Sequence, residues 1–257
     1  MSAPDSAPDS PADAPEHATA SEPVTAPIGP PWLALGRGPR PDRPGLGWTE
    51  LAIAAVSYVG LQLVLVGGAA VLSGGTPASG WLVAGSAASA LGAVGLALSA
   101  RVRSLTAVGL RRVPGRTLVT AVGLGIVVWV VSRLLIVAYI AVTGDTADPQ
   151  EALTLFTGPV SVVVVVVLGG LVVPLGEELL FRGVGYGALR RYGRVVAAVA
   201  TALVFALAHG LNVVFSAALV LGLLNAALYE RTRSIWPCVA AHATFNLISF
   251  GLVLALR

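Results

Sequence analysis

PVSVVVVVVLGGLVVPLGEELLF, residues 159–181, decides the fold class of this chain. The stretch carries no ionisable residue before Glu177 and Glu178 near its end. A bilayer span needs about 20 mainly apolar residues, and this stretch is long enough. In lipid only helices and closed barrels satisfy their backbone polar groups, and a uniformly apolar run favours the helix despite its β-branched valines. The stretch therefore predicts a transmembrane helix.

The composition of the whole chain extends this prediction. Hydrophobic residues make up 56% of the 257 residues and charged residues 11%, whereas soluble globular proteins carry about 25% charged residues. The mean hydropathy is +0.84. Seven hydrophobic stretches can be drawn, at 51–73, 81–100, 117–142, 159–181, 195–211, 213–229 and 235–256. We therefore predict an all-α, polytopic transmembrane helix bundle with about seven spans.

The first 47 residues differ from the rest. They are rich in Ser, Ala, Pro and acidic residues and poor in large apolar ones, so they bury too little surface to offset chain entropy. We predict a disordered cytoplasmic tail over 1–47, N-terminal transmembrane helices over 48–157 and a catalytic transmembrane core over 158–257. The tail lacks the basic start and immediate apolar core of a secretory signal, so the first hydrophobic stretch is expected to remain as an anchor.

Arginines cluster before the first hydrophobic stretch and after the second, fourth and sixth. They are Arg37, Arg40, Arg43, Arg101, Arg103, Arg111, Arg112, Arg116, Arg190, Arg191, Arg194, Arg231 and Arg233. The connections SGGTPASG and TGDTADPQE carry no basic residue. The positive-inside rule then predicts a cytoplasmic N-terminus and an external C-terminus. We expect an integral protein of a prokaryotic plasma membrane. Because the arginines lie beside spans, membrane lipids are expected partners and nucleic acid is not.

Two single residues need separate interpretation. Cys238 is the only cysteine, which excludes an intrachain disulfide and a cysteine-based metal cluster. Arg133 interrupts the third hydrophobic stretch near its outer end. A long arginine there can reach the interface or pair with Asp145 or Asp148, and we expect this structural role rather than a catalytic one.

The remaining ionisable groups within the spans lie in the last third of the chain. A charged group at a helix centre costs about 2.5–3.5 kcal/mol, so such groups are expected to be paired, to face the bundle interior and to be functional. Glu178 and Arg182 stand four residues apart, with the acid first, which favours an ion pair on one helix. Glu177 lies about 100° around that helix and is left as the available carboxylate.

Two further pairs have helical spacing. Phe205 and His209 are four residues apart in FALAHG, as are His242 and Asn246 in HATFN. A carboxylate, two imidazoles and a carboxamide can activate water and hold a developing oxyanion. Since lipid excludes the water that hydrolysis needs, we expect a polar cavity opening to the cytoplasm.

The three motifs together identify a family resemblance. E-E-x-x-x-R at Glu177, Glu178 and Arg182, F-x-x-x-H at Phe205 and His209, and H-x-x-x-N at His242 and Asn246 resemble, in order and spacing, the motifs of the CPBP family. This family includes the CAAX prenyl endopeptidases and the Abi proteins, and the resemblance covers about 159–257. It implies an intramembrane protease in which Glu177 and His209 activate water and His242 and Asn246 support the tetrahedral intermediate. Glu178 and Arg182 would hold the fold as a structural ion pair.

The sequence leaves open whether the protein uses a metal ion. The family has been described both as a metalloprotease and as a metal-free glutamate peptidase. Glu177, His209 and His242 could supply three ligands to a catalytic zinc ion with water as the fourth. The sequence has no H-E-x-x-H helix, and Asn246 is a poor zinc ligand, which favours the metal-free interpretation.

Three functions are therefore compared. The first is an endopeptidase that acts on a membrane-associated or lipid-modified peptide or protein. The second is a transporter or proton-relay protein, because Glu, His and Arg inside spans also mark ion pathways, although no inverted repeat is evident. The third is a non-catalytic scaffold or immunity protein of the same fold, for which the motif residues would be dispensable.

Overall fold

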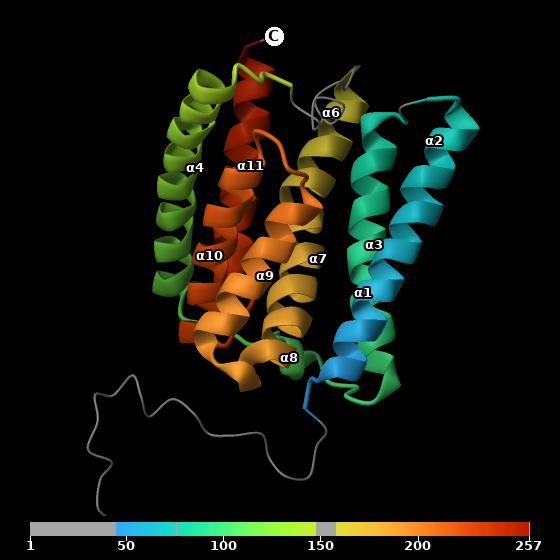
Figure 1. Ribbon diagram of the computed structural model, residues 1–257, viewed down its shortest axis with the longest axis vertical. Coiled ribbons are helices and arrows are strands. Elements are labelled where there is room, and N and C mark those ends of the chain that lie inside the picture. Colours follow the sequence, from blue (N-terminus) through green and yellow to red (C-terminus); the bar gives the residue numbers. More distant parts are fainter. Residues whose placement is uncertain (1–44, 76, 148–157, 257) are drawn as a thin grey trace, which may run out of the picture. The chain divides into compact units, whose positions relative to one another are not determined.

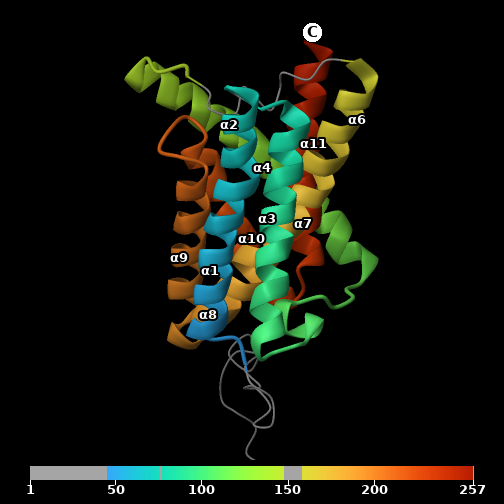
Figure 2. The same cartoon turned by 90° about the vertical axis from the view of Figure 1, so that its right-hand side faces the viewer.

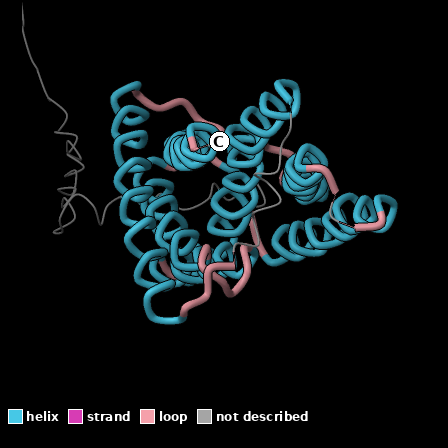
Figure 3. Tube along the Cα trace, turned by 90° about the horizontal axis from the view of Figure 1, so that it is seen from above, coloured by secondary structure: helices cyan, strands magenta, loops and turns pink. Residues whose placement is uncertain are grey.

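The computed structural model describes residues 45–75, 77–147 and 158–256. Within these ranges the regular elements are helices and none is a strand, which confirms the predicted all-α class (Figure 1). Seen from above in Figure 3, the described chain consists of helices and the loops that join them. Most of the predicted tail, residues 1–44, lies outside the described residues, as does Asp148.

The N-terminal part contains four labelled helices. They are α1 (Trp48–Gln62), α2 (Gly68–Ser73), α3 (Ser79–Ala100) and α4 (Gly115–Thr143). A π-helical turn, Leu63–Gly67, joins α1 to α2, so that Trp48–Ser73 runs as one helical segment of 26 residues. A short 3-10 turn, Leu105–Val108, lies between α3 and α4. Figure 2 shows α1 and α3 side by side, in agreement with the contacts between them.

The C-terminal part carries the predicted core. Its helices are α6 (Gly158–Val167), α7 (Val173–Glu178), α8 (Gly187–Leu189), α9 (Arg194–Ala208), α10 (Phe215–Thr232) and α11 (Trp236–Ala255). Two π-helical stretches, Leu168–Val172 and Leu179–Tyr186, flank α7, so that Gly158–Tyr192 is one helical segment of 35 residues. Such π-helical insertions are frequent at functional sites, and these two lie on either side of the glutamate pair.

The arginine-rich connections lie together at one end of the bundle, here called the basic end. It comprises the starts of α1, α4, α9 and α11 and the ends of α3, α8 and α10 (Figure 1). Hydrogen bonds join these connections: Arg101 Nε donates to Glu50 Oε1 at 2.8 Å, and Ser234 Oγ donates to the Arg111 carbonyl oxygen at 2.6 Å. Alternating helices gather the arginines in this way, as the sequence predicts.

Among the residues that the structure describes, five helical segments are long and apolar enough to cross a bilayer: Trp48–Ser73, Ser79–Ala100, Gly115–Thr143, Gly158–Tyr192 and Trp236–Ala255. The chain is thus an integral membrane protein. The predicted fifth and sixth spans form α9 and α10, which do not reach that criterion. With 15 residues, α9 is only about 22 Å long, against a hydrocarbon thickness of about 30 Å. Polar residues near the end of α10, including Asn225 and Glu230, lower its hydropathy.

Small residues let the helices that carry the motifs approach closely. A Cβ atom on Gly125 of α4 would lie 2.5 Å from the carbonyl oxygen of Ala241 in α11, next to His242. A Cβ atom on Gly222 of α10 would lie 3.0 Å from the Cβ atom of Ala202 in α9. Small residues at membrane helix crossings permit backbone contact of this kind. They place α4, α9, α10 and α11 around the polar residues.

Candidate active site

The glutamate pair lies at the end of α7. Glu177 is buried but keeps 9% of its surface accessible, whereas Glu178 and Arg182 are fully buried. Buried charges are tolerated only when they are paired and hydrogen-bonded. The predicted ion pair is present: Arg182 Nη1 lies 3.2 Å from Glu178 Oε1.

Glu178 has more partners than this arginine. Its Oε1 atom also accepts hydrogen bonds from Asn225 Nδ2 and from His242 Nδ1, both at 2.8 Å. Arg182 Nη2 in turn donates to the Gly222 carbonyl oxygen at 2.9 Å. Glu178 therefore connects α7, α10 and α11, and it contacts one of the two histidines directly.

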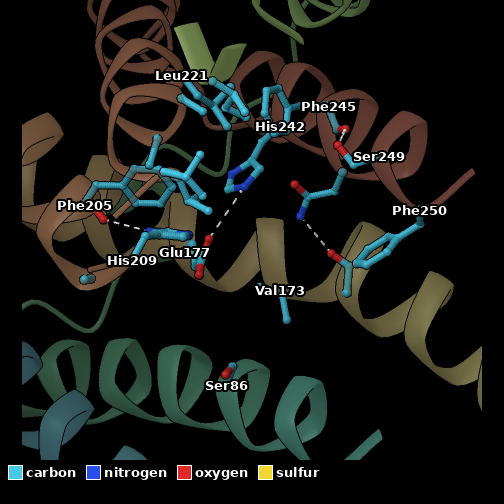
Figure 4. Close-up of a pocket in the computed structure, with 18 of the residues that line it drawn as sticks. Ser86, Val173, Glu177, Phe205, His209, Leu221, His242, Phe245, Ser249 and Phe250 are labelled. Atoms are coloured by element: carbon cyan, nitrogen blue, oxygen red, sulfur yellow. Dashed lines mark hydrogen bonds and ion pairs between the residues drawn. The ribbon is translucent and has the colours of Figure 1, made fainter. Parts of the chain in front are cut away.

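The contact with Glu178 determines how His242 is oriented. A carboxylate only accepts hydrogen bonds, so the Nδ1 atom of His242 carries the proton in this pair. The other ring nitrogen, Nε2, lies 3.7 Å from Glu177 Oε2. Figure 4 shows the imidazole pointing toward Glu177. His242 thus stands between the two carboxylates, with Nε2 on the side of the available one.

His209 directly follows the last residue of α9 along the chain. Its Nδ1 atom lies 2.8 Å from the Phe205 carbonyl oxygen, which only accepts, so Nδ1 donates here as well. The neutral ring then has an unprotonated Nε2 atom that can take a proton from water. The predicted F-x-x-x-H pair is present as a ring contact, with 4.6 Å between the centroids.

Phe205 organises the neighbouring rings. It is almost fully buried, and its ring centroid lies 5.7 Å from that of His242 in an edge-to-face arrangement. The guanidinium carbon of Arg182 lies 4.8 Å from the Phe205 centroid, which is within cation–π range. Phe205 supports the motif by packing between the histidines and the arginine.

Asn246 lies one turn beyond His242 on α11. Its Nδ2 atom donates to the carbonyl oxygen of Gly169 at 2.9 Å. Gly169 lies in the π-helical stretch Leu168–Val172, just before α7. A carboxamide nitrogen carries two protons, so one hydrogen bond leaves a second donor. Asn246 is therefore held against the same helical segment that carries Glu177.

The comparisons with known proteins agree with this geometry. Residues 159–248 match a family model described as "Rce1-like: Type II CAAX prenyl endopeptidase Rce1-like". This match, over 90 of the 257 residues, supports a CAAX protease family for this part of the chain. No curated protein and no solved structure matches the chain.

The CAAX protease motifs border one cavity of about 600 Å³. Glu177, His209, His242 and Asn246 all line it, together with residues of α1, α3, α4 and α10 (Figure 4). The residues that line the cavity lie in the middle of the bundle and in the half away from the basic end. The described lining residues therefore do not reach the arginine-rich side, at which the sequence led us to expect the opening.

Arg133 also lines this cavity. Its guanidinium carbon lies 5.5 Å from the Trp129 ring centroid, and its Nη2 atom donates to Ser132 Oγ at 3.4 Å. Of its two expected partners, Asp145 accepts a hydrogen bond from the Tyr139 hydroxyl at 3.1 Å, and Asp148 lies outside the described residues.

The zinc alternative can be compared with the side-chain positions. In the described ranges, no group of three or more His, Cys, Asp or Glu side chains could hold a metal ion as placed. Glu177, His209 and His242 border the same cavity but do not converge on a common metal position. As placed, these residues do not fit a zinc site.

Asn225 is the site residue that the sequence did not single out. It is fully buried in α10 and donates to Glu178. Its own carbonyl oxygen accepts from the Cys238 thiol at 3.2 Å. An asparagine inside an apolar helix was the available signal, because a carboxamide is costly in lipid unless a partner satisfies it.

Proposed function

We propose that the protein is an intramembrane endopeptidase that hydrolyses a peptide bond of a membrane-associated or lipid-modified substrate. The observation that supports this proposal most directly is the position of Glu177. Its Oε2 atom lies 3.7 Å from His242 Nε2, and it borders a cavity that His209 and Asn246 also line. The family match supports protease activity, and the residue roles below are our assignment.

Glu177 and His209 activate the water molecule. As the water oxygen forms a bond to the scissile carbonyl carbon, its proton passes to Glu177 or to the Nε2 atom of His209. General bases contribute typically 10²- to 10⁴-fold when they are positioned in this way. The same proton then passes to the amine nitrogen as the carbon–nitrogen bond breaks, so that an acid and an amine are the products.

His242 and Asn246 support the oxyanion of the tetrahedral intermediate. Asn246 has one carboxamide proton beyond the hydrogen bond to Gly169. His242 already donates from Nδ1 to Glu178, so it needs a second proton, on Nε2, to donate to the oxyanion. The negative charge of Glu178 is a suitable partner for such a ring, as the carboxylate is in a catalytic triad.

The decisive experiment compares membrane proteomes. Cells expressing Glu177→Ala are expected to accumulate an uncleaved precursor that cells expressing the unchanged protein process, while both variants are present in the membrane in equal amounts. Asp145→Asn serves as the matched control, because this acidic residue bonds to Tyr139 rather than to a candidate catalytic residue. Retained processing by Glu177→Ala would refute the proteolytic assignment and favour the scaffold alternative.

A further inference from the structure

The cavity around the candidate site extends in one direction. On α11 its lining residues run from His242 to Val253, which corresponds to about 16 Å of helix and ends close to Ala255. On α4 they begin only at Arg133, and they continue beyond the helix to Thr146. Both helices start at the basic end, so the cavity lies along their later parts and not beside their first turns.

The other helices contribute in the same way. The lining residues of α1 are Tyr58 and Gln62, at its far end, and those of α3 are Val83 and Ser86, near its start. In α10, which runs back toward the basic end, the last lining residue is Leu221. The described lining residues thus come from the middle of the bundle and from the end without the arginine clusters, here called the arginine-poor end.

A packed layer separates the candidate site from the basic end. This floor layer consists of five buried residues, Val108, Tyr186, Tyr229, Ile235 and Cys238. The rings of Tyr186 and Tyr229 meet edge to face with 5.7 Å between centroids. The Ile235 amide donates to the Gly109 carbonyl oxygen at 3.0 Å, which fixes the loop before α4 beneath this layer.

Close backbone contacts tighten the floor layer. A Cβ atom on Gly183 would lie 2.8 Å from the Cβ atom of Val108, and one on Gly109 would lie 2.6 Å from the Tyr229 ring. Protein interiors packed at this density leave few voids that hold water. From the basic end, a peptide has to displace these side chains or pass through a separate apolar pocket between α1 and α9, which shares Tyr58 and Ala208 with the cavity. The cavity itself already leads to the glutamate from the opposite direction.

We propose that the substrate peptide enters from the arginine-poor end, which the positive-inside rule places outside the cytoplasm. This inference rests on the proposed endopeptidase function and specifies its substrate class. The cleaved bond belongs to an exported segment, presented at the outer surface by a membrane-anchored or lipid-modified protein. A peptide terminus confined to the cytoplasm does not reach the site by this route.

The access route is tested first without any substrate. In a Cys238→Ser background, Ser249→Cys places a thiol on the cavity wall, and Ser86→Cys does so from α3. Ser99→Cys is the matched control, because Ser99 is exposed at the end of α3 that belongs to the basic end. A charged, membrane-impermeant methanethiosulfonate is added to right-side-out and to inverted vesicles.

The expected labelling pattern of the two cavity positions is opposite to that of the control position. Ser249→Cys and Ser86→Cys should react in right-side-out vesicles, and Ser99→Cys in inverted ones. Two cavity positions are used so that the test survives if one variant fails to insert. Reaction of the cavity thiols from the same side as Ser99→Cys would overturn the proposed access route.

The second test uses catalysis. A membrane-impermeant, quenched-fluorescent peptide, copied from the junction of the precursor that Glu177→Ala accumulates, is added to both kinds of vesicle. Glu177-dependent cleavage in right-side-out vesicles alone supports the inference. Cleavage in inverted vesicles alone overturns it and leaves the protease function intact. Lack of cleavage in both, with normal labelling, contradicts the protease function and not the accessibility of the cavity.

Discussion

A single oxygen atom, Glu178 Oε1, accepts hydrogen bonds from three side chains on three different helical segments. Charge-assisted hydrogen bonds of this kind are about twice as strong as neutral ones, and the loss of one leaves a buried group unsatisfied. Glu178 therefore does more than stabilise the fold through Arg182. It fixes which nitrogen of His242 faces Glu177.

Asn225 is expected to affect turnover through this arrangement. Replacing it by Leu removes one donor from Glu178 and lets the carboxylate and His242 shift. Loss of a residue that holds the hydrogen-bond partner of a site residue typically lowers activity by about 10- to 100-fold. We expect kcat to fall by this amount with KM nearly unchanged, because Asn225 is not among the residues that line the cavity. Steady-state kinetics on the precursor peptide measures both constants.

Cys238→Ala is the matched control for this prediction, since the hydrogen bonds described for its thiol go to the backbone oxygens of Asn225 and Ser234 and not to a candidate catalytic side chain. It should retain kcat within a few fold. An Asn225→Leu variant with unchanged kcat, or one in which KM alone rises, would show that Asn225 has no positioning role.

At this scale the sequence predicted the motif pairs but not all their contacts. Helical spacing was sufficient for Glu178 with Arg182 and for Phe205 with His209, because both pairs lie within one turn. Spacing cannot reveal a contact between residues 47 positions apart, such as that of Asn225 with Glu178. The link from Glu178 to His242 was missed for the same reason, and Glu178 was assigned to the scaffold alone.

Among the helices, the crossing of α4 and α11 is the one that positions His242. Gly125 lies against the backbone of Ala241, so a methyl group there has to push the two helices apart. Overpacking of this kind typically costs about 1–3 kcal/mol. Gly125→Ala is therefore expected to lower the apparent Tm in detergent and to reduce turnover.

Gly123 provides the matched control on the same helix. A Cβ atom there would meet nothing within 4 Å, so Gly123→Ala should keep both Tm and activity. Equal Tm values for the two variants would contradict the view that close approach of α4 and α11 holds the site together.

The helices themselves were predictable to different degrees. Residues 159–181 predicted a span because of their length and uniform apolarity, and the structure extends it to Tyr192. The two π-helical stretches around α7 were not foreseen, since no local pattern in the sequence distinguishes them from α-helix. The shortness of α9 follows from the turn after His209, where Gly210 adopts a φ of 93°, a value that favours glycine.

In the molecule as a whole, the arginine clusters and the cavity lie toward opposite ends of the bundle. The arginines gather at the basic end, as alternating spans predict, but the cavity lies in the other half. The sequence suggested cytoplasmic access because His242 stands only nine residues beyond Arg233, about 13 Å of helix. That estimate could not include the floor layer, whose residues come from four separate parts of the chain.

The orientation of the whole chain has its own test. Ser73, at the end of α2, and Arg112, before α4, are exposed at opposite ends of the bundle. In a Cys238→Ser background, single cysteines at these two positions are expected to react with an impermeant maleimide from opposite faces of the membrane. Arg112→Cys should react from the cytoplasm. Labelling of both from one face would contradict the alternating topology.

The floor layer also has an electrical consequence. A water-filled cavity would leave the floor layer as the main insulating barrier, and most of the membrane voltage would then fall across Tyr186, Tyr229 and their neighbours. An elementary charge that crosses the full membrane potential changes its energy by about 2.3 kcal/mol per 100 mV. Glu177 and His242 lie on the arginine-poor side of this barrier. Hydrolysis should therefore proceed at nearly the same rate in energised and de-energised membranes.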